Sequence, residues 1–188
     1  MIPLGFYGLL KFYPILLSRG YDAQICGWTF LVLGVAGSVG GILFALPQSN
    51  LKKLLAFSSV ENMGIISMGL GLAILIFAYT GEWVLAQLAV AGSLVHIVNH
   101  AFLKGSLFLA AGSVLRQTGT LDQDRLGGLM RKMPFTGTLF TVNALGLAGM
   151  PPLNGFIGEL AIYVAAFSAI MSNHPVLVAV GFIVAVTL

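Results

Sequence analysis

Three side chains that can exchange protons recur every four residues in the middle of one long apolar segment. They are His96, His100 and Lys104. On an α-helix this spacing places all three on one face, about 6 Å apart along the axis at each step. The surrounding segment, residues 83–115, contains no other charged or imidazole group and is long enough to cross a bilayer. Ionisable groups at such a depth are costly and usually functional, so the row predicts proton transfer inside a membrane.

A purely structural role is the alternative for this row, with the histidines bonded to neighbouring helices and Lys104 extended to the membrane surface. Three groups in register favour the functional interpretation. His96 and His100 have the spacing of a zinc-binding pair, but the glutamate of a His-Glu-x-x-His motif is missing. The sequence contains no phosphate-binding loop, flavin fingerprint or haem signature. We therefore expect no metal, no cofactor and no redox centre on this chain.

Two carboxylates outside the row are further candidates. Glu159 lies four residues after Gly155, just beyond a pair of prolines. If a helix begins there inside the membrane, its free N–H groups and its dipole would stabilise the carboxylate; the alternative is a carboxylate in an interfacial loop. Glu61 is flanked by apolar residues and is a candidate counter-charge for Lys104 or a histidine, or else a structural partner. Lys11 is expected to reach the membrane surface from a helix end.

The composition is that of an all-α, polytopic membrane protein. Apolar residues make up 58% of the chain and charged residues 8%, against roughly 25% charged residues in soluble domains. The mean hydropathy is +0.99. The single cysteine, Cys26, excludes an internal disulfide, and no signal-peptide pattern is recognisable at the start.

Hydropathy and turn residues predict about six membrane spans. Uncharged or nearly uncharged stretches cover residues 1–18, 27–46, 51–78, 83–115 and 175–188, in addition to the region 134–172. At 1.5 Å per residue the segment 83–115 would be roughly 50 Å long. It must therefore tilt, project from the bilayer or be broken, with Asn99 and Gly105 as candidate break points.

Residues 134–172 contain two short apolar runs separated by Pro151 and Pro152. Proline ends a helix because it has no N–H and clashes with the preceding turn. Either the two runs are separate spans joined by an exterior loop, or they are halves of one discontinuous helix. Irregular backbone at membrane depth is tolerated where it is buried or lines a polar cavity, as in transporters.

Charge predicts the orientation in the membrane. If each long segment crosses once, the loops at Lys52-Lys53 and at Arg116 to Lys132 lie on the same side, which then holds six of the nine basic residues. The positive-inside rule places that side in the cytoplasm. We expect an integral protein of a prokaryotic inner membrane.

Three ordered segments carry a family resemblance. They are residues 50–64 (NLKKLLAFSSVENMG), 96–109 (HIVNHAFLKGSLFL) and 149–159 (GMPPLNGFIGE). Together they resemble the antiporter-like proton-channel subunits of respiratory complex I, Mrp-type cation/proton antiporters and membrane-bound nickel–iron hydrogenases. The second half of the first segment and the proline motif look most like the large membrane subunit of hydrogenase 4 and formate hydrogenlyase complexes.

The resemblance implies a fold of two inverted five-helix repeats, each with one broken helix. This single domain, residues 1–188, would cover the end of the first repeat and most of the second, and residues 134–172 would be the second broken helix. His96, His100 and Lys104 match the central proton-relay positions, and Glu159 matches the terminal site. Lys11 matches a basic helix end rather than a relay position, with Pro3 where a buried lysine often stands. The first repeat's Glu–Lys pair is absent, which implies a fragment of a longer subunit.

The resemblance predicts a proton-translocating subunit of a redox-driven complex, with the relay formed by His96, His100, Lys104, Glu159 and Glu61. It would have no catalytic redox centre and would bind other membrane subunits and peripheral redox subunits, not nucleic acid. Two alternatives are a sodium/proton antiporter subunit of the Mrp type and a truncated structural subunit of a membrane arm.

Overall fold

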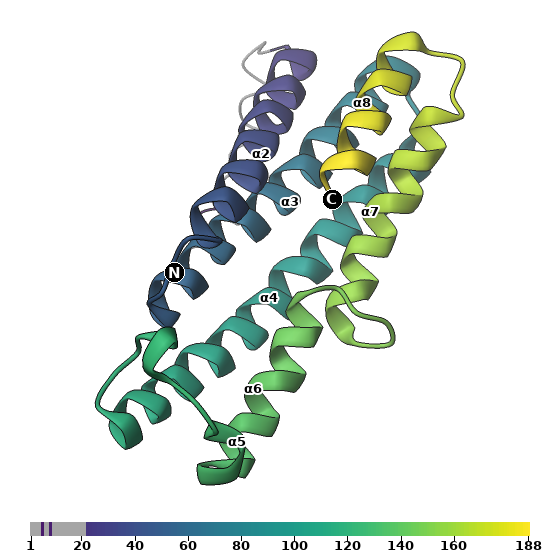
Figure 1. The fold of residues 1–188 in the computed structure, drawn as a ribbon. Coiled ribbons are helices and arrows are strands. Elements are labelled where there is room, and N and C mark those ends of the chain that lie inside the picture. The colour runs from purple at the N-terminus through teal and green to yellow at the C-terminus, as the bar shows by residue number, and fades with distance from the viewer. Residues whose placement is uncertain (1–4, 6–7, 9–21) are drawn as a thin grey trace.

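The protein is a bundle of helices in the part of the chain that the computed structural model describes, namely Gly5, Gly8 and residues 22–188. Three helices, α2 to α4, are long and apolar enough to cross a membrane. The all-α expectation is confirmed, whereas the helix expected over residues 1–18 and the role expected of Lys11 concern mainly residues outside this part. The elements are α2 (Ala23–Ala45), α3 (Leu51–Thr80), α4 (Trp83–Thr118), η1 (Gln123–Arg125), α5 (Leu129–Lys132), α6 (Pro134–Leu147), α7 (Asn154–Ile170) and α8 (Pro175–Thr187) (Figure 1).

The ends of the two central helices follow from residues visible in the sequence. The side chain of Asn50 caps α3 by accepting hydrogen bonds from the backbone N–H groups of Lys52 and Lys53, at 3.0 and 3.3 Å. Gly81 and Gly119 end α3 and α4 in the left-handed conformation, with φ of 69° and 73°. Glycine adopts this conformation without a steric penalty, so both helices stop where the sequence allows the chain to turn.

Helix α4 is continuous over its 36 residues. Asn99 and Gly105 both lie inside it, so the break considered at these positions does not occur. An unbroken helix of this length extends about 54 Å, well beyond a hydrocarbon core of about 30 Å. It must therefore tilt or project from the bilayer, and its basic C-terminal turn at Arg116 is the end suited to project.

Helices α6 and α7 are two halves of one interrupted helix that runs antiparallel to α4 (Figure 1). Gly146, near the end of α6, packs against Leu103 of α4. Farther along, Asn154 at the start of α7 hydrogen-bonds Asn99, and Gly158 packs against His96. The contact points on α4 move steadily toward its N-terminus as the α6–α7 chain advances. A hairpin would reverse this order, so the discontinuous-helix expectation is confirmed.

Close helix packing depends on glycine at particular positions. A Cβ on Gly64 of α3 would lie 2.8 Å from the Cα of Ser38 on α2, and one on Gly41 would lie 2.7 Å from the Cα of Glu61. Glycine lets the two backbones meet, as is common between helices in membranes. The tight face expected from the α2 glycines is confirmed in part: Gly40 has nothing within 4 Å of its Cβ position.

The two basic segments lie at one end of the bundle. The backbone N–H of Leu51 donates to the carbonyl of Leu121 at 3.0 Å, and that of Gln123 donates to Ser49 at 2.8 Å. These bonds join the turn before α3 to the loop after α4. At the other end, the ring of His174 stacks on Tyr79 with centroids 4.7 Å apart, so this histidine is packed against a helix end and not simply exposed.

Candidate functional site

The three groups of the α4 row are buried inside the bundle. His96, His100 and Lys104 expose 2%, 4% and 5% of their surface. His96 and Lys104 both bond to polar groups of α3, the helix that precedes α4 in the chain. A membrane protein whose titratable groups turned toward lipid would leave them exposed on the outside of such a bundle. The row instead faces a neighbouring helix.

Neutral acceptors hold the ammonium group of Lys104. Its Nζ donates to the backbone carbonyl of Leu55 at 2.8 Å and to the hydroxyl of Ser58. Among residues 22–188 the salt bridge found joins Arg125 to Asp122, and none joins Lys104 to a carboxylate. A buried cation without an ion-pair partner is costly, so this arrangement is unusual for a purely structural lysine.

The amide of Asn62 fixes the orientation and tautomer of His96. Asn62 Nδ2 donates to the carbonyl of Ser58 at 2.8 Å, which directs its Oδ1 toward the imidazole. His96 Nε2 lies 3.0 Å from that oxygen. Because an amide oxygen only accepts, Nε2 carries the hydrogen. Nδ1 of the neutral ring is then an acceptor, and it has no protein partner among the described residues.

His100 lies between the other two groups of the row and has no such anchor. Both of its ring nitrogens are buried without a hydrogen-bond partner among the described residues. Buried polar atoms nearly always have a partner, in the protein or in ordered water. The ring is therefore the member of the row best able to change its hydrogen-bond partners.

Glu159 is half-buried in α7, beside the interruption. The preceding residue, Gly158, brings α7 into backbone contact with His96, because a Cβ there would lie 3.0 Å from the His96 Cα. The Glu159 side chain points back toward the break, as side chains on helices do. It lies against Gly149, whose Cβ position is 3.0 Å from the Glu159 Cδ. Gly149 is in the left-handed conformation, with φ of 65°.

Glu61 is half-buried in α3, three residues beyond Ser58. Its backbone contacts Gly41 of α2. The structure thus brings α3 against the α4 row and sets Glu159 beside His96. Glu61 shares a helix with the groups that hold Lys104, without an ion pair to it among the described residues.

Sequence reasoning missed the partners of the row. Ser58 and Asn62 hold Lys104 and His96, and Asn99 and Asn154 bond each other across the break. A signal was present, since Ser58 and Asn62 are four residues apart, as are the members of the α4 row. Two polar rows with the same period on consecutive helices can face each other when the helices are antiparallel.

These features define an integral membrane protein with several spans, one interrupted helix and a buried polar seam between α3 and α4. The family described as NADH:quinone oxidoreductase/Mrp antiporter, TM matches residues 1–187. The chain belongs to this family of antiporter-like membrane subunits. The family and the fold expected from the three segments are therefore confirmed.

Individual relatives agree with this assignment. The chain is 40% identical to formate hydrogenlyase subunit 3 of Escherichia coli (strain K12), over 92% of its own length and 28% of the relative's. It is 39% identical to a Na(+)/H(+) antiporter subunit of Bacillus subtilis (strain 168), over 85% and 19%. The fold matches a chain in the structure of the Mrp complex from Dietzia sp. DQ12-45-1b, with a TM-score of 0.68 and 25% identity, over 87% and 29% of the two chains. The chain thus spans less than a third of each relative.

Proposed function

We propose that this chain conducts protons across the membrane as part of a redox-driven complex, with Lys104 as the central carrier. His100 and His96 link Lys104 toward α7, Glu159 is the terminal site beside the helix break, and Glu61 supplies negative charge on α3. The observation that carries the proposal is the buried ammonium of Lys104, 5% exposed and bonded to a carbonyl and a hydroxyl. Burying an unpaired cation in a membrane protein is hard to explain by stability alone.

The proposal extends to the assembly. The chain would correspond to the end of one repeat and most of the next in a longer antiporter-like subunit of a prokaryotic inner membrane. Its partners would be other membrane subunits and peripheral redox subunits of a hydrogenase or complex I-like enzyme, which supply the driving force. The end with Lys52, Lys53 and the loop 116–132 would face the cytoplasm.

The first prediction concerns Lys104. Lys104→Met keeps the length of the side chain but removes the charge and the exchangeable proton. It is expected to abolish coupled proton uptake, measured with a pH-sensitive dye in inverted membrane vesicles. Lys53→Met is the matched control, because Lys53 is exposed at the start of α3, and it is expected to leave uptake unchanged. Undiminished uptake by Lys104→Met, with the protein present at normal level, would reject the proposal.

Sodium/proton exchange is the second candidate function, because one relative is named as part of a Na(+)/H(+) antiporter. The same vesicles separate the two functions. Proton flux that requires sodium and proceeds without electron donors would favour exchange. Flux that requires the electron donor and is indifferent to sodium would favour redox-driven conduction.

A further inference from the structure

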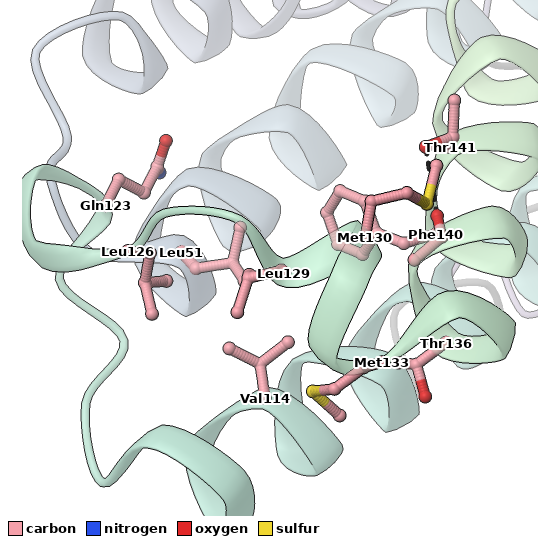
Figure 2. Close-up of a pocket in the computed structure, with 11 residues that line it drawn as sticks. Leu51, Val114, Gln123, Leu126, Leu129, Met130, Met133, Thr136, Phe140 and Thr141 are labelled. Carbon is pink, nitrogen blue, oxygen red and sulfur yellow. Dashed lines mark hydrogen bonds between the residues drawn. The ribbon is translucent and has the colours of Figure 1, made fainter.

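An apolar cavity opens at the basic end of the bundle, away from the polar seam. Its volume is about 330 Å³, at the lower end of the range of roughly 300–1,000 Å³ seen for small-molecule sites. Figure 2 shows side chains from the end of α4, from η1 and α5 and from the start of α6 around it. Its apolar wall includes Val114, Leu126, Leu129, Met133 and Phe140.

Exposed cations surround this cavity. Arg131 and Lys132 lie on α5 between the lining residues Met130 and Met133. Lys52 and Lys53 directly follow another lining residue, Leu51. All four side chains are exposed, and none forms a salt bridge among residues 22–188. The cavity therefore combines an apolar interior with an uncompensated positive rim.

The depth of the cavity in the membrane follows from the helix break. Asn99 faces the break, and Val114 lies fifteen residues farther along α4, about 22 Å by helical rise. Along α6, the distance from the break to Pro134 is about 20 Å by the same rise. With the break near the bilayer centre, the half-thickness of the hydrocarbon is about 15 Å and that of the whole bilayer is roughly 20–22 Å. Both distances place the cavity at the level where headgroups meet acyl chains.

We propose that this cavity binds an anionic phospholipid of the surrounding leaflet, with the upper acyl chain against Val114, Leu129 and Phe140 and the phosphate near Arg131 and Lys132. Basic clusters at the membrane surface attract anionic headgroups, and the apolar wall supplies the surface that a soluble anion would not need. The lipid would join α5 and α6 to the ends of α3 and α4. This site is distinct from the polar seam, and it does not depend on the transport proposal.

Lipid retention tests the proposal. The protein, purified from membranes in a mild detergent, is mixed with phosphatidylglycerol or phosphatidylcholine, and bound lipid is counted by native mass spectrometry. We expect one phosphatidylglycerol to be retained in preference to phosphatidylcholine. Each basic residue near an anionic surface is worth about 1 kcal/mol, about fivefold in affinity, so Arg131→Gln with Lys132→Gln should weaken retention about 30-fold. Arg125→Gln is the matched control and should have a smaller effect, because Arg125 is paired with Asp122 at 3.3 Å.

A second pair of variants tests the apolar wall without changing charge. Thr141→Phe places an aromatic ring at a lining position and should reduce retention of phosphatidylglycerol. Asn143→Phe, on the same helix at a position that does not line the cavity, should not. Equal retention of both lipids, or retention unaffected by the double charge variant, would overturn the proposal. So would binding of an oligoglutamate peptide with no retained lipid, which would assign the surface to a protein partner.

Discussion

At the scale of single residues, the acceptors around Lys104 suit a group that must gain and lose a proton. A carboxylate at hydrogen-bond distance would favour the ammonium form strongly, whereas a carbonyl and a hydroxyl bind it less tightly. The hydroxyl of Ser58 has a second advantage. It can accept from the ammonium and can also donate to the neutral amine, so Lys104 can keep a partner in either protonation state.

The second prediction follows from this dual role. Ser58→Ala removes the hydroxyl that contacts Lys104 Nζ but leaves the Leu55 carbonyl in place. Proton uptake in vesicles should fall several-fold without being abolished, because one of the two partners remains, and Ser58→Thr should restore much of it. Ser113→Ala is the control, since that hydroxyl is exposed and bonds within its own helix to Leu109. Wild-type uptake in Ser58→Ala would show that the hydroxyl has no part in transfer.

At the scale of helices, most boundaries could be predicted from sequence and the broken helix could not. Asn50, Gly81 and Gly119 act locally, so their capping roles are visible in the sequence. Asn99 in α4 and the prolines between α6 and α7 are similar as local signals of a break. Only at the prolines is the helix interrupted, because Asn99 keeps helical backbone bonds and uses its side chain for α7. That choice depends on a partner 55 residues away.

The third prediction concerns this contact. Asn99 Nδ2 donates to the backbone carbonyl of Asn154 at 2.7 Å, and Asn154 Nδ2 donates to Asn99 Oδ1 at 3.4 Å. Asn99→Ala removes both bonds and Asn154→Ala only the longer one, so Asn99→Ala should destabilise the protein more. Side-chain hydrogen bonds in membrane proteins average about 0.6 kcal/mol, with a maximum of about 1.7. Unfolding in mixed micelles measures the difference, with Asn143→Ala as a reference, since the Asn143 amide bonds only within its own helix. Equal losses from the Asn99 and Asn154 variants would contradict the asymmetric pairing.

The fourth prediction tests the glycine contact between α2 and α3. In Gly64→Ala the new methyl group would lie 2.8 Å from the Cα of Ser38, so the helices must separate. Overpacking of this kind costs typically about 1–3 kcal/mol. Gly40→Ala, with nothing within 4 Å of the new atom, should be neutral or slightly stabilising because alanine favours the helix. Stability is again read from unfolding in micelles, and similar values for the two variants would argue against close α2–α3 packing.

At the scale of the whole molecule, the charge pattern and the interrupted helix together determine the topology. The turn before α3 and the loop after α4 are joined by backbone hydrogen bonds, as the shared side expected from their charges requires. The helix break then decides where the rest of the chain lies. If α6 and α7 make one crossing, the α7–α8 turn is on the side of the α3–α4 turn, in agreement with the stacking of His174 on Tyr79. If each made a crossing, that turn would be on the opposite side.

The fifth prediction distinguishes these topologies with single cysteines in a Cys26→Ser background. A membrane-impermeant maleimide should label Glu82→Cys and Asn173→Cys in intact cells, because these exposed turns share the outer side, and Gln117→Cys only in inverted vesicles. Met150→Cys, in the connection between α6 and α7, should resist labelling from both sides, because it lies at membrane depth and the reagent needs water and a thiolate. In a hairpin topology Met150→Cys would be labelled with Glu82→Cys, and Asn173→Cys with Gln117→Cys. That pattern would remove Glu159 from the membrane interior and with it the terminal site of the proposed relay.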